Sequence, residues 1–176
     1  ATHILRRTSE IAVGMSNEHY SAQDRQAAAE EVQELRGQMV LLANTELGGR
    51  YMFSGDAIDT VAFDTAGNYQ GSTETPETLV GDDTWVQVGW DGSEVFQGTV
   101  DVFQVLDDLD TALSTNDPDQ VFALISDLQA AGEQAIDSRQ EVGWQDRKST
   151  RLNSSHTSIS SAAFCLQKKK QHFPQY

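Results

Sequence analysis

Apolar residues recur at alternating steps of four and three residues in two separate stretches of the chain. This spacing is typical of a heptad repeat, in which a narrow apolar stripe runs along an α-helix and packs against a nearly parallel partner helix. We therefore predict that the two stretches form the two halves of one helical bundle. The stripe residues are Ala28, Val32, Leu35, Met39 and Leu42 in the first stretch, and Val102, Leu106, Leu109, Leu113, Val121, Leu124, Leu128, Ala131 and Ala135 in the second.

Start and stop signals place the ends of these helices. Residues 4–16 carry apolar side chains on one stripe, which predicts a preceding helix. Ser21 with Asp24 three residues later is an N-cap signature for the first heptad helix. We expect that helix to end near the Gly-Gly pair at 48–49, since glycine readily takes the positive φ of a C-cap. The Asn-Asp-Pro sequence at 116–118 ends one helix and starts another, with proline at the first helical position.

The middle of the chain has a different texture, rich in threonine, valine, aromatic residues and glycine-containing turns. Residues 61–64, 68–71, 77–80 and 84–90 are strand candidates, and they predict a small antiparallel sheet. About 45 residues bury only a marginal core, so we expect the insert to lean on the helices or on a neighbouring molecule. Trp85 and Trp90 either pack on alternate faces of this thin sheet or form an exposed ligand platform.

The predicted fold class is α+β, with long antiparallel helices in a coiled-coil-like bundle and a small antiparallel β insert between the helical halves. We expect four segments: an N-terminal helical half at 1–50, a β-rich insert at 51–97, a C-terminal helical half at 98–145, and a tail at 146–176. Charge also separates the tail from the rest. Residues 1–145 hold six basic and 26 acidic groups, a net charge of −20, whereas the tail carries +5.

The basic tail looks like translated DNA of technical origin. Residues 146–156 (DRKSTRLNSSH) look like the in-frame translation of a common sequencing adapter, and the match resumes at 159–160 and, with two single-base changes, at 161–166. We therefore exclude 146–176 from the fold prediction and expect the tail to be disordered. The alternative is a genuine basic, serine-rich disordered tail.

Composition argues against several functions. The acidic part repels phosphate backbones, so nucleic acid is not an expected partner. No apolar run is longer than the one at 39–43, which is far shorter than the ~18 to 20 residues that a membrane span needs. Residues 1–145 contain two histidines, no cysteine and no nucleotide-binding or nucleophile motif, so we expect no thiolate catalysis, no zinc site of the usual kinds and no cofactor. Acidic clusters at 82–83, 107–110 and 117–119 allow a calcium alternative, but none has EF-hand spacing, and solvated faces or helix caps are the simpler interpretation.

The sequence LANTELGGRYMFSG at 42–55 resembles the flagellin superfamily and, within it, the hook-associated protein 3 family. Flagellins share the Ala-Asn-Thr and a glycine-containing turn, whereas the Gly-Arg-Tyr-Met-Phe-Ser-Gly form is more similar to the hook–filament junction family. Residues 102–109 and 138–143 fit the returning helix of that family. The resemblance is carried by Asn44, Gly49, Arg50, Tyr51, Phe53, Ser54 and Gly55.

This resemblance implies a non-enzymatic structural subunit of the bacterial flagellum at the hook–filament junction, needed for filament assembly and motility. It implies type III export, an extracellular location, and contacts with copies of itself and with neighbouring hook-associated, hook or flagellin subunits, with an export chaperone as a further partner. Relative to the family the chain begins within the first helix and ends in the adapter-like tail. We therefore expect a soluble, helix-rich monomer that does not assemble. The alternatives are a flagellin filament subunit and, in another class, a carbohydrate- or cation-binding β insert on a helical stalk.

Overall fold

A computed structural model of the chain describes residues 1–75, 77–79, 85–87, 89–138 and 140. It divides into two compact units, Ala1–Ser138 and Arg139–Tyr176. Nearly all of the second unit lies outside the described residues, so the helices and strands below belong to the first unit. The predicted tail at 146–176 also lies outside the described residues, and the expectation that it is disordered stays a prediction.

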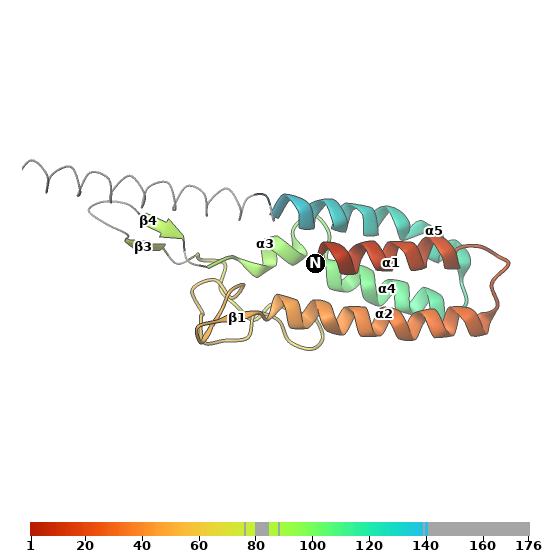
Figure 1. The fold of residues 1–176 in the computed structure, drawn as a ribbon, viewed down its shortest axis with the longest axis horizontal. Helices are drawn as coiled ribbons and strands as arrows, with labels where there is room; N and C mark the ends of the chain where they lie inside the picture. Colours follow the sequence, from red (N-terminus) through yellow and green to blue (C-terminus); the bar gives the residue numbers. More distant parts are fainter. Residues whose placement is uncertain (76, 80–84, 88, 139, 141–176) are drawn as a thin grey trace, which may run out of the picture. The chain divides into compact units, whose positions relative to one another are not determined.

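Antiparallel helices dominate the first unit (Figure 1). Helix α1 (Thr2–Met15) is followed by the longer α2 (Ala22–Ala43), which returns beside it. After the insert, α4 (Val102–Ser114) packs against α2, and α5 (Pro118–Ala123) with the helical residues 125–138 returns past α4. Each long helix runs opposite to its neighbour, so the described residues confirm a mainly helical chain with antiparallel packing.

The core lies along the facing sides of these helices. The predicted stripe residues are buried, except that Leu42 and Ala135 are partly buried against the core. Helix α2 contacts both α1 and α4, and its buried face is accordingly broader than one heptad stripe, since Arg25, Ala29 and Ala43 are buried as well. Helix α1 contributes Ile4, Leu5, Thr8, Ile11 and Ala12.

Side chains cap three helix starts, of which those of α2 and α5 were predicted. Ser21 and Asp24 form a reciprocal capping box at α2, which satisfies amide groups that the first turn leaves unpaired. Asp101 accepts hydrogen bonds from two amides at the start of α4. Pro118 stands in the first turn of α5, where Asp117 caps the helix.

The predicted end of α2 near residues 48–49 is wrong. The helix ends at Ala43, with Asn44 as its C-cap. Gly48 and Gly49, at φ +62° and +82°, instead form the two-residue turn between β1 (Glu46–Leu47) and β2 (Arg50–Tyr51). Two successive positive φ angles are the requirement of a type I′ hairpin turn, so the glycine pair makes a hairpin and not a helix cap.

The insert contains less sheet than predicted. Strands β3 (Glu77–Leu79) and β4 (Trp85–Gln87) pair antiparallel, within two of the four predicted segments. Segments 61–64 and 68–71 are not strands, because the Asp64 side chain holds a tight turn between them and only one bridge, Phe63 to Tyr69, joins them. A short helix, α3 (Gly92–Gln97), capped by Asp91, follows within the part of the chain predicted as β-rich. The described side chains do not include Trp85, so the tryptophan platform stays an untested alternative.

Candidate junction between the bundle and the insert

The segment 42–55 leads from the end of α2 into the insert, and its Asn44 fastens the two together. The Asn44 Nδ2 group donates to the Phe63 carbonyl at 2.7 Å, and its Oδ1 accepts from the Phe63 amide at 2.8 Å. One side chain thus satisfies both backbone groups of Phe63, as a neighbouring strand would. Phe63 is itself buried, so Asn44 fixes where the insert returns to the helices.

Between Asn44 and Phe63 in the sequence, the chain forms the hairpin that contains Gly49, Arg50 and Tyr51. Leu47 pairs with Arg50, and Glu46 pairs with Tyr51. The Tyr51 amide donates onward to the Ile58 carbonyl at 3.0 Å, which anchors β2 to the following loop. The hairpin therefore stands at the end of α2 with its turn exposed and its base attached to the insert.

Ser54 and Gly55 occupy a crowded crossing of three chain segments. The buried Ser54 accepts the Ser72 amide through its carbonyl, and the Gly55 amide donates to the Trp90 carbonyl, each at 3.0 Å. Gly55 has φ +63°, and a Cβ built there would lie 1.9 Å from the Ser72 carbonyl oxygen. Only glycine fits at this position, both by conformation and by space.

An aromatic cluster fills the space beneath this crossing. Phe63 is its centre, with ring centroids 5.1 Å from Tyr69, 5.4 Å from Phe96 and 4.9 Å from Phe103. Phe53 stands edge-on to Phe96 at 5.3 Å. Edge-to-face and tilted contacts of this kind add to the free energy gained by burial. The cluster joins α3, α4 and the loops of the insert into one core with the bundle.

Burial raises the pKa of the Tyr69 phenol to about 12, and the nearby negative charge of Asp91 acts in the same direction. Its hydroxyl donates to the Ser72 carbonyl at 2.8 Å, so the neutral form has a partner in the folded chain. Tyr69 is therefore a neutral structural phenol at the edge of the aromatic cluster.

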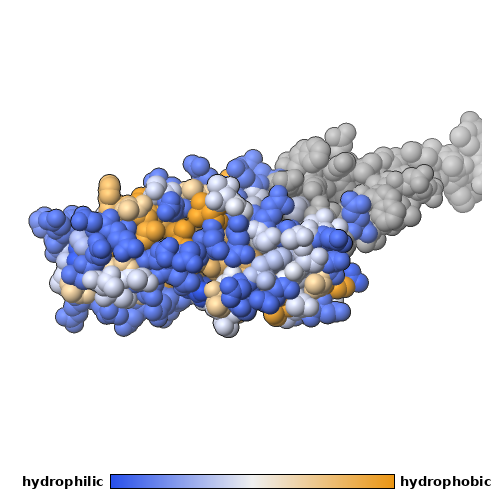
Figure 2. All heavy atoms as spheres, turned by 180° about the vertical axis from the view of Figure 1, so that it is seen from behind, coloured by the Kyte–Doolittle hydropathy of each residue, from blue (hydrophilic) through white to orange (hydrophobic). Residues whose placement is uncertain are grey.

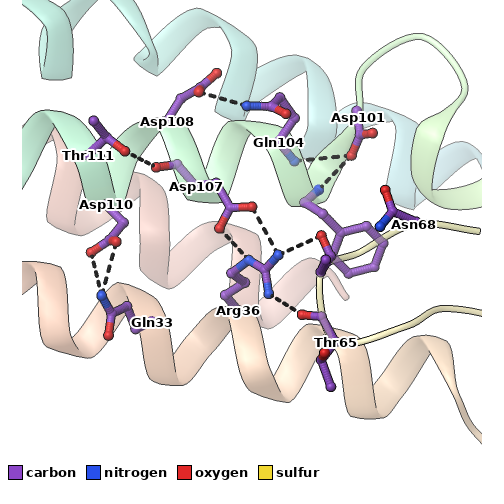
Figure 3. A network of polar contacts seen from close by, with 12 residues as sticks. Gln33, Arg36, Thr65, Asn68, Asp101, Gln104, Asp107, Asp108, Asp110 and Thr111 are labelled. Carbon is purple, nitrogen blue, oxygen red and sulfur yellow. Dashed lines mark hydrogen bonds and ion pairs between the residues drawn. The ribbon is translucent and has the colours of Figure 1, made fainter.

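Arg36 of α2 ties the insert to two helices at once (Figure 3). Its Nη1 donates to the Thr65 carbonyl at 2.9 Å, and its Nη2 donates to the Ala66 carbonyl at 2.8 Å and to Asp107 Oδ2 at 2.9 Å. Its Nε group forms an ion pair with the other oxygen of Asp107, on α4. The planar guanidinium suits this task, because it presents five donors in a fixed fork.

The sequence prediction identified only part of this junction. Asn44, Gly49, Arg50, Tyr51, Phe53, Ser54 and Gly55 all lie in it, while Arg36, Asp107 and most of the aromatic cluster were missed. A signal for the missed pair was present. Arg36 and Asp107 each directly follow a stripe residue, Leu35 and Leu106, on the two helices that the heptad pattern places face to face.

Hydrophilic residues cover most of the face shown in Figure 2, with a small gathering of hydrophobic residues over the bundle. Among the described helices, none has the length and apolar character needed to cross a membrane. Residues 1–75 and the other described ranges also hold no group of three or more histidine, cysteine or acidic side chains placed to bind a metal. The junction brings together an amide, a guanidinium and aromatic rings that fix the insert on the bundle.

Comparison with known proteins identifies where this architecture occurs. No protein-family model matches the chain. Flagellar hook-associated protein 3 of Escherichia coli K12 is 34% identical over 97 residues, which are 54% of this chain and 31% of that protein. The match thus spans about a third of the length of this curated relative.

Solved structures of flagellar hook-associated proteins share the fold over most of their length. FlgL of Bacillus cereus has a TM-score of 0.74 at 23% identity, covering 90% of this chain and 80% of the other. A putative flagellar hook-associated protein of Vibrio parahaemolyticus has a TM-score of 0.85 at 17% identity, with 96% and 79% covered. Hook-associated protein 3 of Legionella pneumophila has a TM-score of 0.78 at 15% identity, with 97% and 88% covered. The comparisons confirm the resemblance of the chain to hook-associated protein 3.

Proposed function

We propose that this chain, which has the fold of the FlgL structures, is a structural subunit of the bacterial flagellum at the junction between hook and filament. The observation that carries the proposal is the agreement of two comparisons: a sequence match to flagellar hook-associated protein 3 and a shared fold with several proteins of that description. The subunit serves filament assembly and motility, and it works outside the cell after type III export.

The geometry of the junction supports a mechanical role. Antiparallel helices resist bending along the bundle, and the insert is fastened to them at two separated points, Asn44 and Arg36. The Phe63 cluster fills the space between these points. A subunit that transmits force needs such a connection, because a loosely tethered insert would move independently of the helices.

The partners of the proposed subunit are copies of itself and neighbouring hook-associated, hook or flagellin subunits, with an export chaperone before assembly. The helices extend in the assembled state as a coiled coil. A flagellin filament subunit is the less supported alternative, because the relatives found carry hook-associated names and not flagellin names. Those names refer to a place in the flagellum and not to a reaction, which favours a structural role.

Electron microscopy of flagella from the bacterium that carries this gene tests the proposal. Gold-labelled antibodies raised against residues 1–138 are applied to sheared hook–filament complexes, with an antibody against the hook subunit as the positional control. We expect one narrow band of label at the boundary between hook and filament. Label along the whole filament would establish the flagellin alternative, and label absent from the flagellum would refute both assignments.

A further inference from the structure

The β1–β2 hairpin presents an apolar and a cationic side chain on one face. Leu47 and Arg50 are direct cross-strand partners, and such partners project from the same side of a hairpin. Leu47 is 68% exposed, and Arg50 is exposed as well. The Arg50 guanidinium has no ion pair or hydrogen bond with any residue that the structure describes. We call Leu47 and Arg50 the hairpin face.

An arginine without a partner among the described residues is unusual in these acidic surroundings. Residues 1–145 carry a net charge of −20, so carboxylates are abundant. Arg6, Arg7 and Arg36 each bind at least one carboxylate, and the buried Arg25 donates to backbone carbonyls and to an asparagine. A cation that pairs with no residue in the described part of the chain, and that lies beside an exposed leucine, matches a partner surface that sets a carboxylate beside an apolar group.

The chain carries such a surface at the other end of the bundle. On α5, Phe122 is 69% exposed, and Asp119 is exposed three residues before it. Residues three apart on a helix are neighbours on its surface. We call Asp119 and Phe122 the α5 face. Figure 1 shows α5 and the hairpin at opposite ends of α2, whose 22 residues span roughly 33 Å at about 1.5 Å per residue.

We propose that the hairpin face of one copy docks on the α5 face of a second copy, with Arg50 on Asp119 and Leu47 against Phe122. Because the two faces are different and lie at opposite ends, the contact is head-to-tail, and such contacts propagate into rings or open filaments. The inference rests on the proposed function, since it names the surface through which subunits meet. Two side chains from each copy bury far less than the ~1,200 Å² of a stable interface, so the contact is transient unless other contacts reinforce it.

Cysteine cross-linking captures a transient contact of this kind. In a Cys165→Ser background, which removes the one cysteine of the chain, a Leu47→Cys chain is mixed with a larger, tagged Phe122→Cys chain and oxidised with copper phenanthroline. The matched control replaces Phe122→Cys by Leu41→Cys, at a site that is 75% exposed but on the hairpin end of α2. We expect the heterodimer to form at least tenfold faster with Phe122→Cys than with Leu41→Cys. Equal rates would overturn the proposal.

Charge reversal tests the ionic half of the contact separately. Arg50→Asp in the Leu47→Cys chain is expected to slow cross-linking several-fold, and Asp119→Arg in the Phe122→Cys chain is expected to restore the rate. If Asp119→Arg does not restore the cross-linking rate, the Arg50–Asp119 pairing is refuted. Preferential cross-linking of Leu47→Cys to a different flagellar subunit in sheared flagella would refute the pairing as well. If gold labelling places the chain at the junction while cross-linking stays at the control rate, the docking inference fails alone. Label absent from the flagellum together with rapid cross-linking would refute the proposed location instead.

Discussion

Asn44 and Phe63 are joined by a two-point hydrogen bond in which one side-chain amide pairs with both backbone groups of the other residue, at 2.7 and 2.8 Å. Asn44 is the C-cap of α2, so the pair connects the end of the longest described helix directly to the centre of the aromatic cluster. No other residue type of similar size presents a donor and an acceptor with this spacing, apart from the one-carbon-longer glutamine.

Replacing Asn44→Ala is expected to lower the free energy of unfolding by about 1 to 3 kcal/mol, because two partly buried backbone groups of Phe63 lose their partner. Urea denaturation followed by far-ultraviolet circular dichroism measures the change. Gln38→Ala, at an exposed position of the same helix, is the matched control and is expected to change stability by less than about 0.5 kcal/mol. Equal effects of the two changes would contradict a special role for Asn44.

Arg36 provides the second attachment of the insert, and its geometry sets an order of effects. Arg36→Ala removes the N–H groups that donate to the Thr65 and Ala66 carbonyls, and it also removes the ionic partner of Asp107. Arg36→Lys keeps the charge but loses the fork, whereas Asp107→Asn leaves both carbonyl bonds in place. Losses of stability are therefore expected to fall in the order Arg36→Ala, Arg36→Lys, Asp107→Asn, with about 2 kcal/mol for the first. Asp107→Asn is the mildest because Asp107 is nearly half exposed and its ion pair is screened by water. If Asp107→Asn lowered stability as much as Arg36→Ala does, the hydrogen bonds from Arg36 to the two carbonyls would contribute nothing to stability.

The helices were predictable because their signals are local and agree with one another. The stripe from Ala28 to Met39 lies within α2, whose first turn carries the capping box that the sequence predicts. The junction was less predictable because its contacts join residues far apart in sequence. Arg36 to Asp107 spans 71 positions, and the one local sign that separates Arg36 from a solvated arginine is its place directly after the stripe residue Leu35. The two false strands failed for a further reason, since Val61 and Tyr69 fit a strand by residue type while the Asp64 side chain bends the chain between them.

Gly67 and Gly48 show two different reasons why a position requires glycine: the backbone conformation, and the space left for a side chain. Both have positive φ, +86° and +62°, but a Cβ at Gly67 would lie 2.6 Å from the Phe103 Cβ, whereas nothing lies within 4 Å at Gly48. Gly48→Ala is expected to cost about 1 kcal/mol from conformation alone, and Gly67→Ala about 3 kcal/mol or more, because the aromatic cluster must also shift. Thermal unfolding compares them, with Gly48→Asn as a control expected to be nearly neutral in a type I′ turn. Similar losses for the two alanine variants would contradict the close packing of Gly67 on Phe103.

Arg25 is a buried cation at the opposite end of the bundle, 3% exposed, and its donors satisfy three backbone carbonyls and the side chain of Asn116. Arg25→Met preserves volume but leaves those acceptors without their donors, so stability is expected to fall by about 2 to 4 kcal/mol. Arg6→Met, which removes an exposed pair with Glu10, is the control and should cost about 0.5 kcal/mol or less. Chemical denaturation measures the free energy of unfolding of both variants. An Arg25→Met variant as stable as the unchanged chain would mean that water replaces the lost donors.

Tyr69 predicts an alkaline limit to the stability of the junction. Burial, aided by Asp91, raises the pKa of its phenol to about 12 in the folded chain, above the ordinary value of about 10. Because the raised value favours the neutral form, the contribution of Tyr69 to stability is fully present below about pH 10 and is lost as pH rises toward 12. Ultraviolet titration of tyrosinate should therefore show one late-ionising phenol that disappears in Tyr69→Phe. Asp91→Asn, which keeps a good helix cap for α3 but removes the charge, is expected to lower the pKa of Tyr69. A phenol that titrates at the ordinary value in the folded chain would show that Tyr69 is solvated and that the edge of the aromatic cluster is open.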